Sequence, residues 1–169
     1  DQLLLAEQFG RGGLPLRAVR WFRRAAEQAL DGRDLEAVRR HAQRAIDAGA
    51  TNDDLAAAYR LQAVASYWQS RYSDAQGQAT SAARLFPAGT SEWFRAVAEA
   101  VVSSARLGDF ETLDQWFDRA ASTEPSPGAE PAQLVCLCRG TFQMMFAGRF
   151  AASDTMLARI AAVARAPET

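Results

Sequence analysis

A repeated spacing of residues constrains the possible folds of this chain more than any other feature. Four apolar residues each follow a short polar break and open a helical stretch, at intervals of 37, 38 and 40 residues: Leu35, Tyr72, Phe110 and Phe150. Ten residues after them stand Ala45, Ala82, Ala120 and Ile160, and nine residues before them stand Ala26, Ala63, Val101 and Thr141. Fifteen residues after them stand Ala50, Pro87, Pro125 and Arg165. Self-similarity at such a period is typical of stacked supersecondary units.

The residue types at these positions predict pairs of closely packed helices. Small residues near the middle of each helix allow two helices to approach closely, and the apolar opener fills the wedge between neighbouring pairs. Proline after the second helix ends it and redirects the chain. One pair cannot bury its apolar face alone, so the pairs are expected to stack.

Apolar residues at helical spacing, separated by Gly, Pro and polar breaks, predict an all-α fold, and no sustained β-branched alternation indicates strands. The expected helices cover residues 2–9, 14–30, 35–48, 53–69, 73–85, 91–107, 110–121, 132–146 and 150–165. The expected repeats cover residues 17–50, 53–87, 91–125 and 132–165, within one domain over residues 1–169. Because the chain starts at Asp1 without Met, we expect it to be cut from a longer protein.

At these positions the chain resembles the tetratricopeptide repeat family, over about Arg17 to Arg165. In the second repeat the matching residues are Tyr59, Ala63, Tyr72, Ala75, Ala82 and Pro87. In the third they are Gly108, Asp109, Phe110, Phe117, Ala120 and Pro125. The chain departs from the family pattern at Ala50, Thr141 and Ile160, and its period exceeds the usual length of about 34 residues. The resemblance implies a right-handed α–α superhelix of about nine antiparallel helices.

A second resemblance concerns the run Leu5 to Leu30, LAEQFGRGGLPLRAVRWFRRAAEQAL. It is similar to the start of the helical-repeat region in large bacterial signalling proteins, which carry a serine/threonine kinase domain or an ATPase module ahead of the repeats. This implies a regulatory or sensor arm that binds proteins. The alternative is a self-association or spacer segment of an ATPase-linked transcriptional regulator. The chain itself has no GxGxxG loop, HRD or DFG motif, so we expect no kinase activity in it.

Charge and composition argue against several other classes of protein. The 19 basic residues, all arginine, and 20 acidic residues give a net charge of −1, which does not favour nucleic acid. No apolar run approaches the roughly 20 residues of a membrane helix, and no secretory signal is present, so a cytoplasmic location is expected. The lone histidine, His41, is expected on the surface, and Cys136 and Cys138 are expected to be buried apolar residues. We therefore expect no catalytic residues, no metal and no cofactor.

The first helix of each pair is expected to line a concave groove for a protein or peptide. The predicted groove residues are Arg20, Arg23, Glu27, Arg60, Val64, Tyr67, Trp68, Arg95, Arg106 and Phe142, with Phe146 beside the last. Arginine with flanking aromatics suits a peptide bearing carboxylates or phosphates. Generic protein binding, a pure spacer, and a small-ligand site at Arg60, Tyr67 and Arg95 remain open alternatives. Of the four tryptophans, Trp68 is expected to be partly exposed and the others to pack between repeats.

The residues of the last expected helix indicate a further binding surface. Met156, Leu157 and Ile160 are apolar, and no polar capping helix follows them in this sequence. An apolar face is therefore expected to be open there, and it could support a homodimer through the C-terminal helix.

Overall fold

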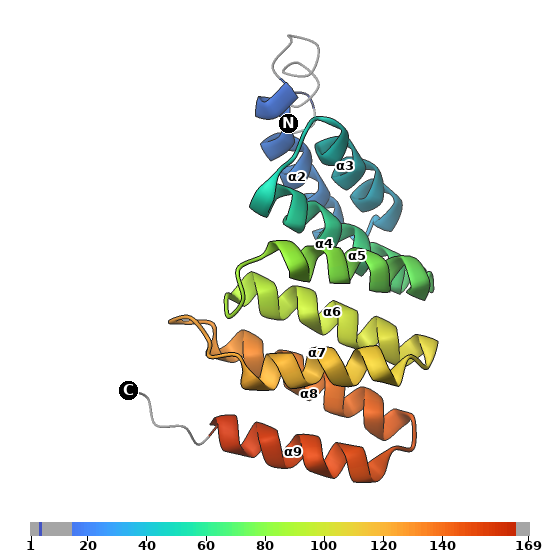
Figure 1. Cartoon of the computed structure of the whole chain (residues 1–169). Helices are drawn as coiled ribbons and strands as arrows, with labels where there is room; N and C mark the ends of the chain where they lie inside the picture. Colours follow the sequence, from blue (N-terminus) through green and yellow to red (C-terminus); the bar gives the residue numbers. More distant parts are fainter. Residues whose placement is uncertain (1–3, 5–14, 165–169) are drawn as a thin grey trace. The chain divides into compact units, whose positions relative to one another are not determined.

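The computed structural model describes residue 4 and residues 15–164, and this part of the chain contains α-helices and no strands (Figure 1). The helices are α2 (Pro15–Asp31), α3 (Leu35–Asp47), α4 (Asn52–Trp68), α5 (Tyr72–Leu85), α6 (Ser91–Leu107), α7 (Phe110–Ser122), α8 (Glu130–Phe146) and α9 (Phe150–Ala164). The expected all-α class is confirmed. The helix expected over residues 2–9 lies, apart from residue 4, outside the described residues.

The helix boundaries follow local signals in the sequence. The four repeat openers are the first residues of α3, α5, α7 and α9, and α5 thus begins at Tyr72, one residue before the expected range of 73–85. The Asp34 carboxylate accepts a hydrogen bond from the Ala37 amide at 2.9 Å, and the Asp109 carboxylate accepts one from the Thr112 amide at 3.1 Å. These side chains satisfy amide groups that the first helical turn leaves without a partner. Gly108 ends α6 with a left-handed φ of 73°, a conformation that glycine adopts without steric cost.

The chain divides into two compact units, and each is described by itself. The first unit ends at Phe86 and contains α2 to α5, and the second begins at Pro87 and contains α6 to α9. The expectation of a single domain over residues 1–169 stays a prediction.

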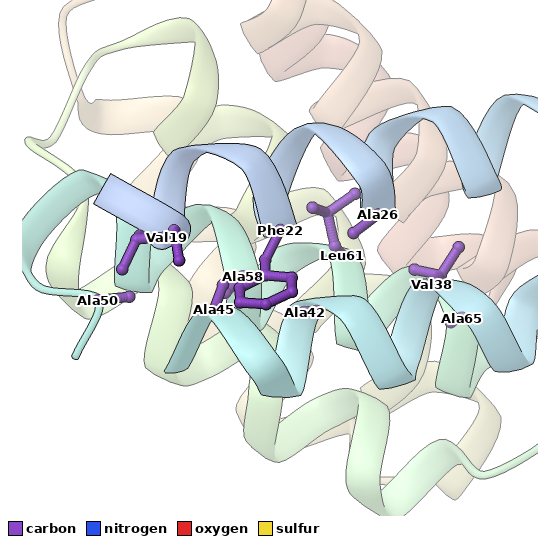
Figure 2. Close-up of a cluster of buried hydrophobic side chains, with 11 residues drawn as sticks. Val19, Phe22, Ala26, Val38, Ala42, Ala45, Ala50, Ala58, Leu61 and Ala65 are labelled. Atoms are coloured by element: carbon purple, nitrogen blue, oxygen red, sulfur yellow. The ribbon is translucent and has the colours of Figure 1, made fainter. Parts of the chain in front are cut away.

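The core of the first unit is built from small residues around a few larger ones (Figure 2). Phe22 and Leu61 lie in a cluster with Val19, Val38 and seven buried alanines contributed by α2, α3, α4 and the turn after α3. The four small residues that the repeat places in α2 to α5, Ala26, Ala45, Ala63 and Ala82, are 0% exposed. Alanine at these positions lets the helices pack closely, which is what the spacing predicted.

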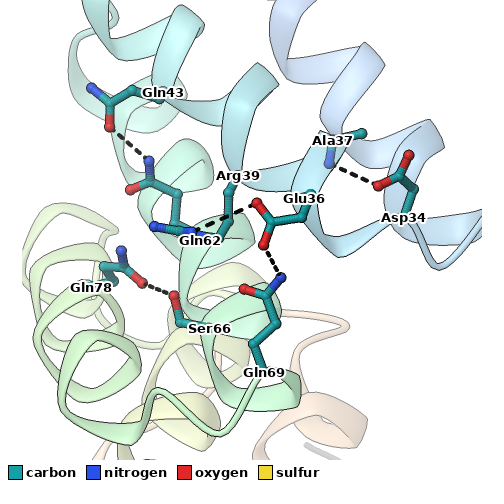
Figure 3. Close-up of polar contacts among 9 residues, drawn as sticks. All are labelled: Asp34, Glu36, Ala37, Arg39, Gln43, Gln62, Ser66, Gln69 and Gln78. Carbon is teal, nitrogen blue, oxygen red and sulfur yellow. Dashed lines mark hydrogen bonds and ion pairs between the residues drawn. The ribbon is translucent and has the colours of Figure 1, made fainter.

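Polar side chains join the same helices beside this core (Figure 3). Gln62 of α4 donates from Nε2 to Gln43 Oε1 of α3 at 3.0 Å. Ser66 of α4 donates from Oγ to Gln78 Oε1 of α5 at 2.9 Å. Gln62 and Ser66 are buried, so these bonds replace the water that the two side chains lose on folding.

In the second unit, α6 is the most buried helix. Its buried residues are Trp93, Phe94 and all of residues 96–104. Glu99 forms a bidentate pair with Arg139 of α8, with N–O distances of 2.6 and 3.2 Å. At the neighbouring Gly140, an added Cβ would lie 2.8 Å from Phe117 Cδ2 and 3.1 Å from Val101 Cγ1. A glycine is therefore required for α8 to lie this close to α6 and α7.

Gly140→Ala is expected to destabilise the protein by about 1–3 kcal/mol, because the new methyl group overlaps the Phe117 ring. The control is Gly77→Ala in α5, where an added Cβ meets nothing within 4 Å. That change is expected to stabilise by about 0.5–1 kcal/mol, since alanine favours helix. Urea unfolding of both variants measures the difference, and a Gly140→Ala variant as stable as Gly77→Ala would contradict the close approach.

Arg139→Ala is expected to cost about 2–3 kcal/mol, because it leaves the carboxylate of Glu99 buried without its guanidinium partner. The Glu99 side chain is only 12% exposed in the pair. In the matched control, Arg95→Ala removes a partner of Glu92, and both of those side chains are at least 43% exposed. The control is expected to cost less than about 1 kcal/mol. Equal losses in thermal or urea unfolding would show that burial does not separate the two pairs.

Candidate partner-binding surfaces

Seven of the predicted groove residues lie on two adjoining helices of the first unit. Arg20, Arg23 and Glu27 follow one another at helical spacing on α2, and Arg60, Val64, Tyr67 and Trp68 do so on α4. α2 packs directly on α4. Arg23 joins the two helices, because its Nε lies 3.3 Å from the Asp54 carboxylate of α4 and 4.0 Å from that of Glu27. These seven residues thus lie on two helices that contact each other, and the expectation that they line a concave groove stays a prediction.

An aromatic cluster of Tyr67, Trp68 and Tyr72 lies where α4 meets α5. The Tyr67 ring lies edge-on to Trp68 at 5.8 Å and to Tyr72 at 5.6 Å between centroids. Trp68 is 70% exposed, which confirms the prediction made for it. The packing role expected of the other tryptophans is borne out by their burial: Trp93 is 0% exposed, Trp116 is 8% exposed, and Trp21 packs against the core of the first unit.

The arginines of the predicted groove interact with groups of the protein itself. Arg23 pairs with Asp54, and Arg95 pairs with Glu92 one turn earlier on α6. Arg60 and Arg106 also interact with other groups. Arg20 is exposed. The positive charge available for an anionic partner is therefore smaller than the arginine count suggested.

The remaining predicted residues belong to the second unit, with Arg95 and Arg106 on α6 and Phe142 on α8. Phe142 is 55% exposed and its ring lies 4.7 Å from that of Phe146, which is 74% exposed. Val135 and Met145, which are not among the predicted groove residues, are also exposed on α8, at 57% and 47%. Val135 lies seven residues before Phe142 and Met145 three residues after it, so the helical period places them on the same side of the helix and could have identified them.

The apolar face predicted on α9 is present only in part. Leu157 is 48% exposed, and Ile160 is partly exposed. Met156 is 6% exposed, so its assignment to the open face was wrong. Met156 and Leu157 are adjacent in sequence and point about 100° apart around the helix, so only one of them can face the core.

Two further predictions require correction. His41 was expected on the surface, yet it is 7% exposed and lies on the buried side of α3. It follows Val38 by three residues and precedes Ala45 by four, so its place on the apolar stripe outweighs its arginine neighbours. The cysteine prediction is right for buried Cys136 and wrong for Cys138, which is exposed.

Searches of the described residues for two other kinds of site found none. No group of three or more His, Cys, Asp or Glu residues is placed to hold a metal ion. In the same residues, no helix combines the length and the apolar character that a membrane span requires. A scan against protein-family models, a search of the curated proteins and a search of the solved structures each found no match to this chain.

The two thiols are expected to differ strongly in reactivity. Burial raises the pKa of Cys136 from 9.0 to about 12, an effect that the nearby Arg139 guanidinium only partly offsets, so this thiol stays protonated. With a disulfide reagent at pH 8, we expect one thiol, Cys138, to react in the native protein, and two to react in denaturant. Rapid labelling of the native Cys138→Ser variant would contradict this.

The same pKa shift predicts a pH dependence of stability. The unfolded chain ionises the Cys136 thiol from about pH 9.0, whereas the folded chain does not until about pH 12. The unfolding free energy should therefore fall as pH rises through this window. The fall should be steeper in the native sequence than in Cys136→Ala, as measured by urea unfolding at several pH values.

Proposed function

We propose that this chain is a non-catalytic module for binding a protein or peptide, and that the surface formed by α2 and α4 with the aromatic cluster is its binding site. The exposed Trp68 is the observation that carries the proposal. Exposure of the large apolar ring of Trp68 to water is energetically unfavourable, and the edge-on contact with Tyr67 holds the ring in place. Tryptophan and tyrosine anchors supply much of the binding energy at protein interfaces.

Repeated helix pairs make such a surface suitable for an extended partner. We propose that the pairs continue as a right-handed, tetratricopeptide-like solenoid, in which first helices such as α2 and α4 present side chains to the same partner. The small residues buried at repeat positions support this arrangement. The resemblance of Leu5 to Leu30 supports a place in the regulatory arm of a cytoplasmic bacterial signalling protein, such as a serine/threonine kinase.

The contacts of the arginines bear on the chemistry of the partner. An acidic peptide at Arg23 would compete with the carboxylate of Asp54, which already lies 3.3 Å from its Nε. An acidic group that binds the exposed Arg20 leaves the Arg23–Asp54 ion pair in place. We therefore propose aromatic and apolar contacts at Trp68 as the main attraction, with acidic groups of the partner limited to the edge of the surface at Arg20.

A second candidate function, self-association through the C-terminal helix, is favoured by one observation. Leu157 on α9 and Phe142 and Phe146 on α8 are large apolar side chains exposed to solvent. Sedimentation over a concentration range separates the two functions. A chain that stays monomeric at all concentrations excludes self-association and leaves partner binding at the α2–α4 surface as the remaining candidate.

Trp68→Ala is expected to abolish binding of the proteins that the native chain captures, because it deletes the proposed anchor. The fold should be kept, since the buried side chains of α4 are unchanged. The measurement is capture from a bacterial extract with identification of the bound proteins, followed by titration of the purified partner. Loss of an interface anchor is expected to weaken binding by about 30-fold or more. Leu85→Ala on α5, at a side chain 40% exposed, is the matched control. Equal binding by both variants would refute the role of the aromatic cluster.

A further inference from the structure

The outer side of α2 carries three arginines at helical spacing. Arg17, Arg20 and Arg24 follow one another at intervals of three and four residues, so each lies one turn from the next on the same side of the helix. The opposite side of α2 is the buried one, since it contributes Phe22 and Ala26 to the core. Arg17 and Arg20 are exposed, and Arg24 is half-buried. We refer to Arg17, Arg20 and Arg24 as the arginine stripe.

The acidic side chains closest to the stripe along the chain are held by another arginine. Residues 17–26 contain no acidic residue, and Glu27 is the first that follows. Arg23, on the side of α2 that faces α4, has its Nε 4.0 Å from the Glu27 carboxylate and 3.3 Å from that of Asp54. Among the residues that the structure describes, none places a carboxylate within 4.0 Å of the arginine stripe. Its guanidinium groups therefore keep N–H donors that no carboxylate in this part of the chain occupies.

One arginine of the stripe is held in position by an aromatic ring. The guanidinium carbon of Arg24 lies over the Trp21 ring, 5.2 Å from its centre. Trp21 itself packs against the core of the first unit. A guanidinium group that contacts a ring through its face keeps the N–H groups at its edge available for hydrogen bonds. Arg24 is therefore partly ordered before a partner binds, which lowers the entropic cost of binding.

The stripe also places like charges next to one another. Arg20 has Arg17 three residues before it and Arg24 four residues after it. Like charges at these spacings destabilise a helix, whereas an acidic residue at the middle position would form favourable pairs with both neighbours. Arg20 is exposed, so the fold does not need it for packing. An anionic group bound at Arg20 would relieve the repulsion.

The length and surroundings of the stripe indicate the kind of anion. Arg17 and Arg24 are about 10 Å apart along the helix axis. Acidic residues at alternate positions of an extended segment are about 7 Å apart, so two such carboxylates fit along the stripe. The net charge of −1 gives no overall field that attracts nucleic acid. The apolar side of α2 is buried in the core and cannot enter a lipid surface.

We propose that the arginine stripe binds an extended acidic segment of a partner protein. Arg20 donates charge-assisted hydrogen bonds to one carboxylate of the segment, and Arg17 or Arg24 donates to the next. This inference rests on the proposed partner-binding function and specifies the chemistry of the partner on the Arg20 side of the α2–α4 surface. Arg17 and Arg24 are not among the predicted groove residues, and the acidic segment needs no contact with Trp68.

Arg20→Glu tests the stripe, because it reverses the charge at its centre. The probe is a fluorescently labelled oligoglutamate peptide, titrated with the full chain at low ionic strength. Arg20→Glu is expected to weaken binding by about tenfold or more, since it removes charge-assisted hydrogen bonds and adds repulsion. The thermal midpoint of the variant is expected to rise at the same ionic strength, because the new carboxylate pairs with Arg17 and Arg24. Loss of binding without loss of stability separates a binding role from a folding role.

Arg40→Glu on α3 is the matched control, because Arg40 is also exposed and the substitution changes the net charge by the same amount. It is expected to leave binding of the oligoglutamate peptide unchanged. Trp68→Ala, which tests the proposed function, should also leave it unchanged, so failure of one proposal is distinguishable from failure of the other.

The proposal is overturned if the native chain does not bind the oligoglutamate peptide, or if Arg20→Glu binds it as tightly as the native chain does. A loss in Arg40→Glu or Trp68→Ala equal to that in Arg20→Glu also overturns it, because the stripe is then not the site. Vesicles of anionic phospholipid and single-stranded RNA are titrated in parallel. Tighter binding of either one than of the peptide, abolished by Arg20→Glu, assigns the stripe to a different class of partner and likewise overturns the proposal.

Discussion

Close contact between helices at small residues is the constraint on which both units depend. Ala26, Ala45, Ala63 and Ala82 are completely buried in the first unit, and Gly140 performs the same task in the second. Interiors of proteins pack as densely as organic crystals, so a larger side chain at such a point displaces a whole helix. The spacing of small residues therefore sets which helices can touch, and it does so before any individual contact between larger side chains matters.

The same arrangement explains why apolar side chains reach the surface. A pair of helices has two apolar sides, and its own partner helix covers only part of them. In the second unit, Gly140 of α8 abuts Phe117 and the buried Val102 lies on α6, while Leu157 and Phe142, 40 residues after Phe117 and Val102, are exposed. In the first unit the exposed aromatic residue is Trp68, at the end of α4. Positions that are equivalent in the repeat can therefore differ strongly in exposure, because burial depends on which helices lie alongside each pair.

The polar residues have mainly structural roles in the described part of the chain. Gln62 and Ser66 connect neighbouring helices, Glu99 pairs with Arg139, and Arg23 joins α2 to α4. Charges held in this way contribute to the relative placement of helices within a unit, and they are less available to a ligand. The binding chemistry proposed at Trp68 consequently rests on aromatic and apolar side chains rather than on these arginines.

The sequence by itself located the ends of the described helices to within two residues, because caps, glycines, prolines and repeat openers such as Tyr72 and Phe110 act on neighbouring backbone groups. It also predicted the exposure of Trp68. Only the tertiary structure decided the burial of His41 and Met156, the exposure of Cys138 and the ion pairs of Arg23 and Arg139. These depend on how each helix is rotated about its axis and on residues distant in sequence, such as Asp54 and Glu99, that packing brings alongside.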